Sequence, residues 1–183
     1  IRGDLYRSTK KYIPNNSSRL LPSNPFGEDL NIARLLPSYF LEWKFPVVSP
    51  NRHTIIEPIV NFTIAPSDKE YFQIPNEDSI AFELNSANIF FNNRIQGFDR
   101  WEYGNRINYG IQISHFWGDR VIKALLAQSY RFSDLSFSYT GNGLRKDFSD
   151  LIFDLFYKPN KNLTISYRGR MNEDDLNLTR SEF

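Results

Sequence analysis

Apolar and polar positions alternate along most of this chain with a repeat of two residues. Between residues 101 and 116 the aromatic and aliphatic side chains fall mainly on odd positions, and the polar ones fall mainly on even positions. Between residues 54 and 64 the apolar side chains take the even positions instead. This period predicts β-strands with one face in an apolar medium and the other in a polar medium.

We expect about eight strands. They cover residues 1–8, 35–48, 52–65, 100–117, 120–132, 148–157, 163–171 and 176–183. Several reach ten residues, beyond the usual five or six of globular sheets and close to the 9–11 that cross a bilayer obliquely. Aromatic residues gather near the strand ends, as in outer-membrane barrels.

The connections differ in length. Short ones are predicted at 49–51, at Gly118-Asp119 and at 158–162, and long polar ones at 9–33, 66–99 and 133–146. Short turns on one side and long loops on the other are typical of outer-membrane barrels. The short turn at 172–175 is an exception, because the order of the strands puts it on the outer side.

These patterns predict an all-β fold, an antiparallel transmembrane β-barrel with long extracellular loops. The positions in phase with Phe183 are polar, so Phe183 does not end an apolar terminal strand. We therefore expect an arc of about eight strands from a larger barrel, with residues 1–183 forming part of one barrel domain and no second domain.

The polar face of the predicted strands carries charged side chains, and a packed core would not accept such charges without partners. We expect these side chains to line a wet lumen. They are Glu57, Glu102, Arg106, Asn108, Asp150, Asp154, Arg168 and Arg170. Solvation is their simplest role, and steering of a charged cargo is the more specific one.

Composition removes several function classes. The formal net charge is +1, which does not favour nucleic acid. The chain has no Cys, and its two His residues stand far apart, so we expect neither a metal site nor a cofactor. No catalytic triad, paired catalytic acids or phosphate loop is visible, and we expect no enzyme activity.

Residues 74–100 break the alternation but remain rich in Ile, Phe and Leu. Such a loop is expected to pack over or into the barrel, with one helical turn capped by Ser86. Glu77 and Asp78 are interpreted as a capped turn rather than as calcium ligands. Pro58, inside a predicted strand, is expected to mark a bulge.

This segment carries a family resemblance. Asn88-Ile89-Phe90, Asn93 to Arg100 and the strand Asn105 to Gly110 resemble the barrel domain of the LptD family of lipopolysaccharide-assembly outer-membrane proteins, also called organic solvent tolerance proteins. The similarity extends over nearly the whole chain. The sequence departs from the family pattern at Ile95, where an aromatic residue is usual.

The resemblance implies a function and partners. Such a barrel resides in the cell outer membrane among its lipids, and an LptE-like lipoprotein plugs its lumen. It receives lipopolysaccharide from a periplasmic Lpt bridge, through an N-terminal domain that we do not expect in this chain. It then delivers lipopolysaccharide to the outer leaflet between its first and last strands, and we do not expect both of those gate strands here.

Five residues of the loop are the candidate site: Asn93, Arg94, Gly97, Asp99 and Arg100. One hypothesis is contact with the lipoprotein or with lipid phosphates, which arginine binds through two hydrogen bonds. The other is a structural lock in which an ion pair fixes the loop and Gly97 provides a turn. Two alternative functions stay open: a general outer-membrane channel or transporter, and a soluble β-sandwich binding module.

Overall fold

The computed structural model describes residues 2–8, 30–66, 78–80, 82–132, 142–144 and 147–183. These residues form ten β-strands and no helix. The strands are β1 (Arg2–Ser8), β2 (Leu30–Leu36), β3 (Tyr39–Lys44), β4 (Val47–Val48), β5 (Thr54–Ile64), β6 (Arg106–Trp117), β7 (Arg120–Arg131), β8 (Leu151–Asn160), β9 (Leu163–Met171) and β10 (Leu178–Glu182).

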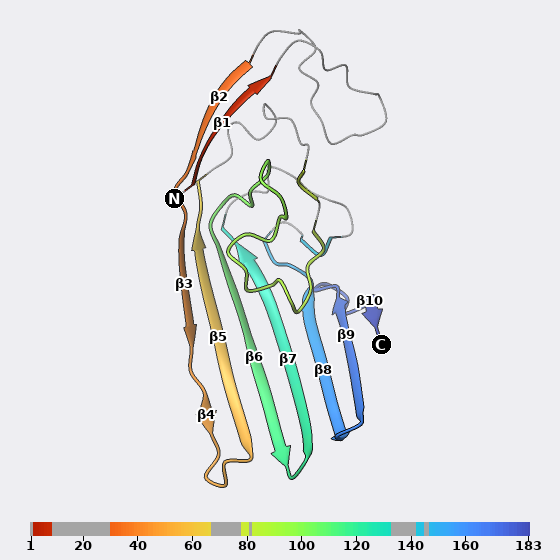
Figure 1. Cartoon of the computed structure of the whole chain (residues 1–183). Helices are drawn as coiled ribbons and strands as arrows, with labels where there is room; N and C mark the ends of the chain where they lie inside the picture. Colours follow the sequence, from red (N-terminus) through yellow and green to blue (C-terminus); the bar gives the residue numbers. More distant parts are fainter. Residues whose placement is uncertain (1, 9–29, 67–77, 81, 133–141, 145–146) are drawn as a thin grey trace.

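Eight of the strands form one antiparallel sheet in the order β10-β9-β8-β7-β6-β5-β3, with β4 also paired to β5 (Figure 1). Strands β1 and β2 form a separate antiparallel pair. From β5 onward, each strand of the large sheet lies beside its neighbour in sequence, which is the up-and-down order of a barrel wall. The all-β antiparallel prediction is confirmed, and the sheet is open, as an arc of a larger barrel would be.

The short connections lie as predicted. Figure 1 shows the links β4–β5, β6–β7 and β8–β9 at one end of the sheet. Residues 9–29, 67–77 and 133–141 of the predicted long connections lie outside the described residues. Gly118 and Asp119 alone join β6 to β7, with Gly118 at φ 60°. Strand β8 runs past its predicted end to Asn160, so only Lys161 and Asn162 separate it from β9.

Two predicted strands are wrong in their extent. Residues 35–48 are divided among β2, β3 and β4, because Pro37 and Pro46 cannot donate to a ladder. Residues 30–33, predicted as loop, belong to β2. The strand predicted from residue 100 begins at Arg106, because residues 100–105 lie outside the ladder and bury the side chains of Arg100, Glu102 and Tyr103. The other boundaries move by three residues or fewer.

Pro58 does not form a bulge. Its pairing with Ile111 keeps the register of β5 and β6 unbroken. On the other side, β3 ends at the pair Lys44–Ile59 and β4 resumes at the pair Val47–Ile56 in the same register. The missing N–H groups of Pro58 and Pro46 therefore interrupt the ladder without shifting it.

The two faces of the sheet differ in burial. Buried positions of β5, β6 and β7 alternate with less buried ones and point to one side. On the opposite side apolar side chains are exposed, among them Ile56, Ile111, Ile113, Ile122 and Leu126. An outward apolar face is the property of a barrel strand that contacts lipid.

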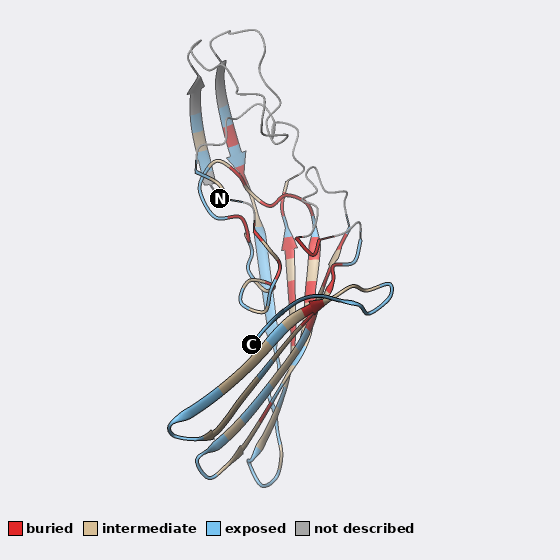
Figure 2. Ribbon diagram, turned by 90° about the vertical axis from the view of Figure 1, so that its right-hand side faces the viewer, coloured by how far each residue is buried: buried red, intermediate tan, exposed pale blue. Residues whose placement is uncertain are grey.

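The apolar core lies between the sheet and the segment that precedes β6. Leu84, Ile89 and Ile95 of that segment pack with Ala127 and Ile152 of the sheet. Figure 2 shows this burial concentrated at the loop end of the strands, while the short-turn end is mostly intermediate or exposed. Among the described residues, no helix is long and apolar enough to span a bilayer.

Candidate functional site

The candidate site is built by residues 78–80 and 82–104, here called the covering segment. Figure 1 shows this segment passing across β6 and β7 at their loop end. Within it, Ile89 N–H donates to the Asn85 carbonyl at 3.1 Å, which closes one helical turn. Asn85 caps this turn, because its Oδ1 accepts from Ala87 N–H at 2.9 Å. The predicted cap, Ser86, instead donates its hydroxyl to Asp154 of β8 at 2.6 Å.

One end of the covering segment is closed by a tight turn lock, formed by Asp78 and Ser79 against residues 97–100. The carboxylate of Asp78 accepts N–H groups from Phe98 at 2.9 Å and from Asp99 at 3.0 Å. In return, Asp99 Oδ2 accepts from Asp78 N–H at 3.0 Å. The hydrogen bonds from the backbone of Asp99 and Phe98 hold the pKa of Asp78 below its ordinary value. Glu77, the other predicted member of this turn, lies outside the described residues.

Gly97 and Arg100 complete the turn lock. Gly97 adopts φ 99°, and a Cβ there would lie 2.6 Å from the Asp78 carbonyl oxygen. Only glycine satisfies both conditions. Arg100 donates its backbone N–H to Ser79 Oγ at 2.8 Å, and its side chain is buried.

Arg34 of β2 fastens the two-stranded sheet to the same turn. It donates to the carbonyls of Asp99 at 2.6 Å and Phe98 at 2.8 Å, and it pairs with Asp4 of β1 at 2.8 Å. Sequence reasoning missed Arg34, because it lies more than sixty residues from the turn and no local pattern distinguishes it.

The other end of the covering segment is held by a buried group of charges, here called the Glu102 cluster: Arg94, Glu102, Arg106 and Arg131. Glu102 receives two hydrogen bonds from Arg94, one of them at 2.7 Å from Nε. It also pairs with Arg131 of β7 at 2.5 Å and with Arg106 of β6 at 3.6 Å. The side chains of Arg94, Glu102 and Arg106 have no solvent exposure.

Electrostatics makes Glu102 the centre of this cluster. Burial alone would raise the pKa of its carboxyl, but the guanidinium groups of Arg106, Arg94 and Arg131 outweigh burial and hold that pKa far below its ordinary value. Glu102 therefore stays ionised, and three cations surround one anion in a site almost closed to solvent. Since Glu102 carries one negative charge, the guanidinium N–H groups that do not bind it need other hydrogen-bond acceptors.

Backbone carbonyls supply part of that need. Arg131 donates to the Tyr103 carbonyl at 2.6 Å, and Arg106 donates to the carbonyls of Phe91 and Asn92. Asn93 adds a further brace, since its Oδ1 accepts from Glu102 N–H at 3.0 Å. The cluster thus ties the backbone of the covering segment to two strands of the sheet.

The sequence predicted the members of this site unevenly. Arg94 and Asn93 meet the cluster, whereas Gly97, Asp99 and Arg100 belong to the turn lock. Glu102 and Arg106 were predicted as lumen-facing residues and instead hold the loop. Sequence reasoning missed Arg131. The period of two places it on the same face of β7 as Ala127 and Ser129, which could have indicated its inward position.

The predicted lumen-facing side chains of the strands share the face that the covering segment lies on. Asn108 illustrates the packing there, because its Oδ1 accepts the Ser129 hydroxyl at 2.6 Å and its Nδ2 contacts Asn61 at 3.3 Å. Five of the eight predicted residues are buried rather than solvated: Glu102, Arg106, Asn108, Asp150 and Arg170. Glu57 and Asp154 are half-buried, and Arg168 is exposed.

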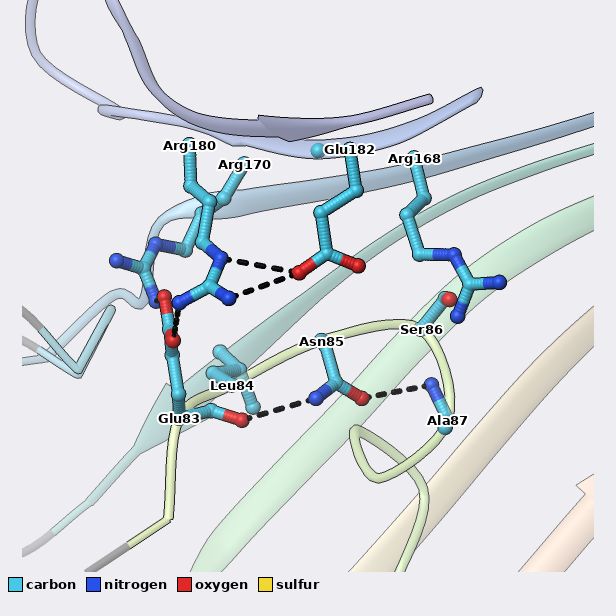
Figure 3. Close-up of a pocket in the computed structure, with 10 residues that line it drawn as sticks. Glu83, Leu84, Asn85, Ser86, Ala87, Arg168, Arg170, Arg180 and Glu182 are labelled. Carbon is cyan, nitrogen blue, oxygen red and sulfur yellow. Dashed lines mark hydrogen bonds and ion pairs between the residues drawn. The ribbon is translucent and has the colours of Figure 1, made fainter. Parts of the chain in front are cut away.

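A second set of contacts joins the covering segment to the last strands. Glu83 pairs with Arg170 of β9 at 3.0 Å and with Arg180 of β10 (Figure 3). Arg170 also pairs with Asp150 at 3.1 Å. Leu84 N–H donates to the Asn142 carbonyl at 2.9 Å. The segment is therefore attached to β6, β7, β8, β9 and β10.

Comparison with known proteins decides the family. The model of the family described as "LptD: LPS transport system D" matches residues 1–183. The chain belongs to the LptD family. A curated relative, the LPS-assembly protein LptD of Nitrosomonas europaea, is 27% identical over 143 residues. That match covers 73% of this chain and 20% of the relative, so the chain spans about a fifth of that LptD protein.

Family membership confirms the resemblance seen at Asn93 to Arg100. LptD proteins are transport and assembly proteins of the outer membrane, and we assign this chain to that membrane. The channel and sandwich alternatives are not favoured by either match.

Proposed function

We propose that this chain is part of the barrel domain of a protein that assembles lipopolysaccharide in the outer membrane. The observation that carries the proposal is the family match along the whole chain. The open antiparallel sheet, apolar on one face and polar on the other, supports it, because a barrel wall facing lipid and a lumen has these two faces. The proposal contains no catalytic step and no cofactor.

Within that barrel, the covering segment is proposed to close part of the lumen. The turn lock and the Glu102 cluster fix its two ends, and its apolar side chains fill the space against β7 and β8. Asn93, Arg94, Gly97, Asp99 and Arg100 are thus proposed as lock residues. The less buried polar residues, Glu57, Asp154 and Arg168, are proposed to face the cargo side of the wall.

The partners of the whole protein are part of the same proposal. They are lipopolysaccharide, an LptE-like lipoprotein in the lumen, and a periplasmic Lpt bridge that reaches the barrel through another domain. The lock residues favour a structural role, because Arg94 already binds Glu102 through two nitrogens and the Asp99 carboxylate already accepts from Asp78 N–H.

Depletion of the full-length protein in its host tests the function. Newly made lipopolysaccharide, followed by pulse labelling, should then fail to reach the cell surface, and expression of the unaltered gene should restore it. The amount of an unrelated outer-membrane barrel is the control for general envelope damage. Normal arrival of lipopolysaccharide in depleted cells would refute the proposal.

A further inference from the structure

A small pocket lies between the covering segment and the last two strands. Its cavity holds about 110 Å³. One wall consists of residues 83–87, and the other consists of residues 168–170 of β9 with Arg180 and Glu182 of β10. A buried water needs at least about 10–15 Å³ by the same measure, so the cavity has room for a group much larger than water.

The charged side chains of the pocket differ in how they are used. Glu83 binds Arg170 and Arg180, and Glu182 Oε1 accepts from Arg180 at 2.8 and 3.1 Å. The side chain of Arg168 makes no ion pair or hydrogen bond with the other described residues, although its backbone belongs to the ladder of β9. Its cross-strand neighbours are Asp154 of β8, whose carboxylate accepts the Ser86 hydroxyl, and Glu182 of β10, whose carboxylate accepts from Arg180.

Arg168 is therefore the cation of this pocket that is available to a ligand. Figure 3 shows it extending from β9 toward the wall formed by Ser86 and Ala87. The other two lining arginines, Arg170 and Arg180, are paired with Glu83, and Arg170 also pairs with Asp150. A guanidinium presents paired N–H donors that match a carboxylate or a phosphate.

The rest of the lining favours a hydroxylated ring beside that anionic group. Asn85 and Ser86 lie on one wall, and Gly169 leaves β9 without a side chain in the other wall. Ser86 donates its hydroxyl hydrogen to Asp154 and Asn85 donates one amide hydrogen to the Glu83 carbonyl, which leaves the Ser86 oxygen as an acceptor and the second Asn85 amide hydrogen as a donor for ring hydroxyls. Leu84 and Ala87 offer apolar contact to a ring face.

We propose that this pocket binds an acidic sugar, meaning a saccharide unit that carries a carboxylate or a phosphate, with Arg168 holding the anionic group. The inference deepens the proposed function, because it assigns the saccharide part of the cargo a contact on the polar face of the wall. The pocket could also bind a free acidic sugar, because such a sugar presents the same anionic group and ring hydroxyls.

Calorimetric titration of the purified full-length protein in detergent tests the site. Glucuronate and glucose 6-phosphate should bind. Glucose, which lacks the anionic group, and inorganic phosphate, which lacks the sugar ring, should bind at least about tenfold more weakly. Arg168→Gln should weaken glucuronate binding about tenfold or more, and Arg168→Lys by less. Arg120→Gln, which removes an exposed arginine at the far end of the sheet, should leave binding unchanged.

Three outcomes would overturn the proposal: equal binding of glucose and glucuronate, no binding of either acidic sugar, or undiminished binding by Arg168→Gln. The ligand comparison uses the unaltered protein and does not depend on the folding of a variant. Dispersed lipopolysaccharide should displace bound glucuronate, and failure to do so would overturn the link to the cargo. Neither titration depends on the depletion experiment, so the two proposals fail separately.

Discussion

The carboxylate of Glu102 and the guanidinium of Arg94 form a doubly hydrogen-bonded pair in which neither side chain has any solvent exposure. They lie eight positions apart along the chain, and both belong to the covering segment. The same carboxylate reaches Arg131 of β7. One acidic side chain thus closes a loop on itself and fixes that loop to the sheet.

Glu102→Gln should destabilise the barrel strongly. It would leave three buried arginines without their counter-charge, and removal of one partner of a buried pair costs about 3–5 kcal/mol. The measurement is the temperature at which the folded, heat-modifiable form is lost in detergent. Glu42→Gln is the matched control, because the pair of Glu42 with Lys44 is partly exposed. Equal effects of the two changes would contradict the central role of Glu102.

The same pair predicts a pH dependence. The pKa of Glu102 is lowered in the folded chain, whereas an unfolded Glu titrates near 4.5. A lowered acid pKa contributes stability that is complete above the unfolded value and is lost as pH falls through the folded value. Unfolding midpoints should therefore decline below about pH 4.5, and the Glu102→Gln variant should decline less steeply over that range.

Asp99→Ala should lower barrel assembly, because it removes the carboxylate that accepts the Asp78 N–H group. We expect a loss of about 1 kcal/mol, the usual contribution of one hydrogen bond. Asp78→Ala should lower assembly further, since its carboxylate accepts two backbone groups. The yield of folded barrel in cells is the measurement, and Asp119→Ala at the β6–β7 hairpin is the control. Normal yield and heat resistance of both turn variants would exclude a structural lock.

Gly97→Ala and Gly118→Ala form a matched pair, because both glycines have positive φ. At Gly118 a new Cβ meets nothing within 4 Å, so the cost should be about 1 kcal/mol from backbone strain alone. At Gly97 the new Cβ meets the backbone of Asp78 and Ser79 at 2.6–2.7 Å, which should add about 1–3 kcal/mol. Denaturant titration gives the free energy of unfolding of both variants. The larger loss at Gly97 measures the steric contact, and the loss at Gly118 measures the backbone strain alone.

Ile111→Arg and Gln112→Arg test which face of β6 contacts lipid. Ile111 lies near the middle of β6 on the apolar face, and Gln112 lies on the opposite face. An arginine at the lipid face near the bilayer midplane costs about 2–4 kcal/mol, so Ile111→Arg should impair insertion into vesicles. Gln112→Arg should insert almost normally, because its cross-strand neighbour Glu57 can accept the new charge. Equal insertion of both variants would contradict the membrane arc.

Periodicity alone predicted the antiparallel wall, its two faces and the position of its turns. These features are local, because a strand displays its period of two in consecutive residues and a hairpin such as Gly118-Asp119 lies between its own strands. The motif Asn93 to Arg100 also indicated the family from the sequence by itself. Its residues lie within one short stretch, so their pattern is visible without knowledge of the fold.

Only the tertiary structure determined what those residues contact. Strand alternation placed Arg106 beside water, but the covering segment lies over it and supplies Glu102 and backbone carbonyls. Arg34 and Arg131 joined the site from strands distant in sequence. A period of two specifies the face on which a side chain lies, but not what covers that face, because the cover depends on where a non-repeating loop finds apolar and charged partners.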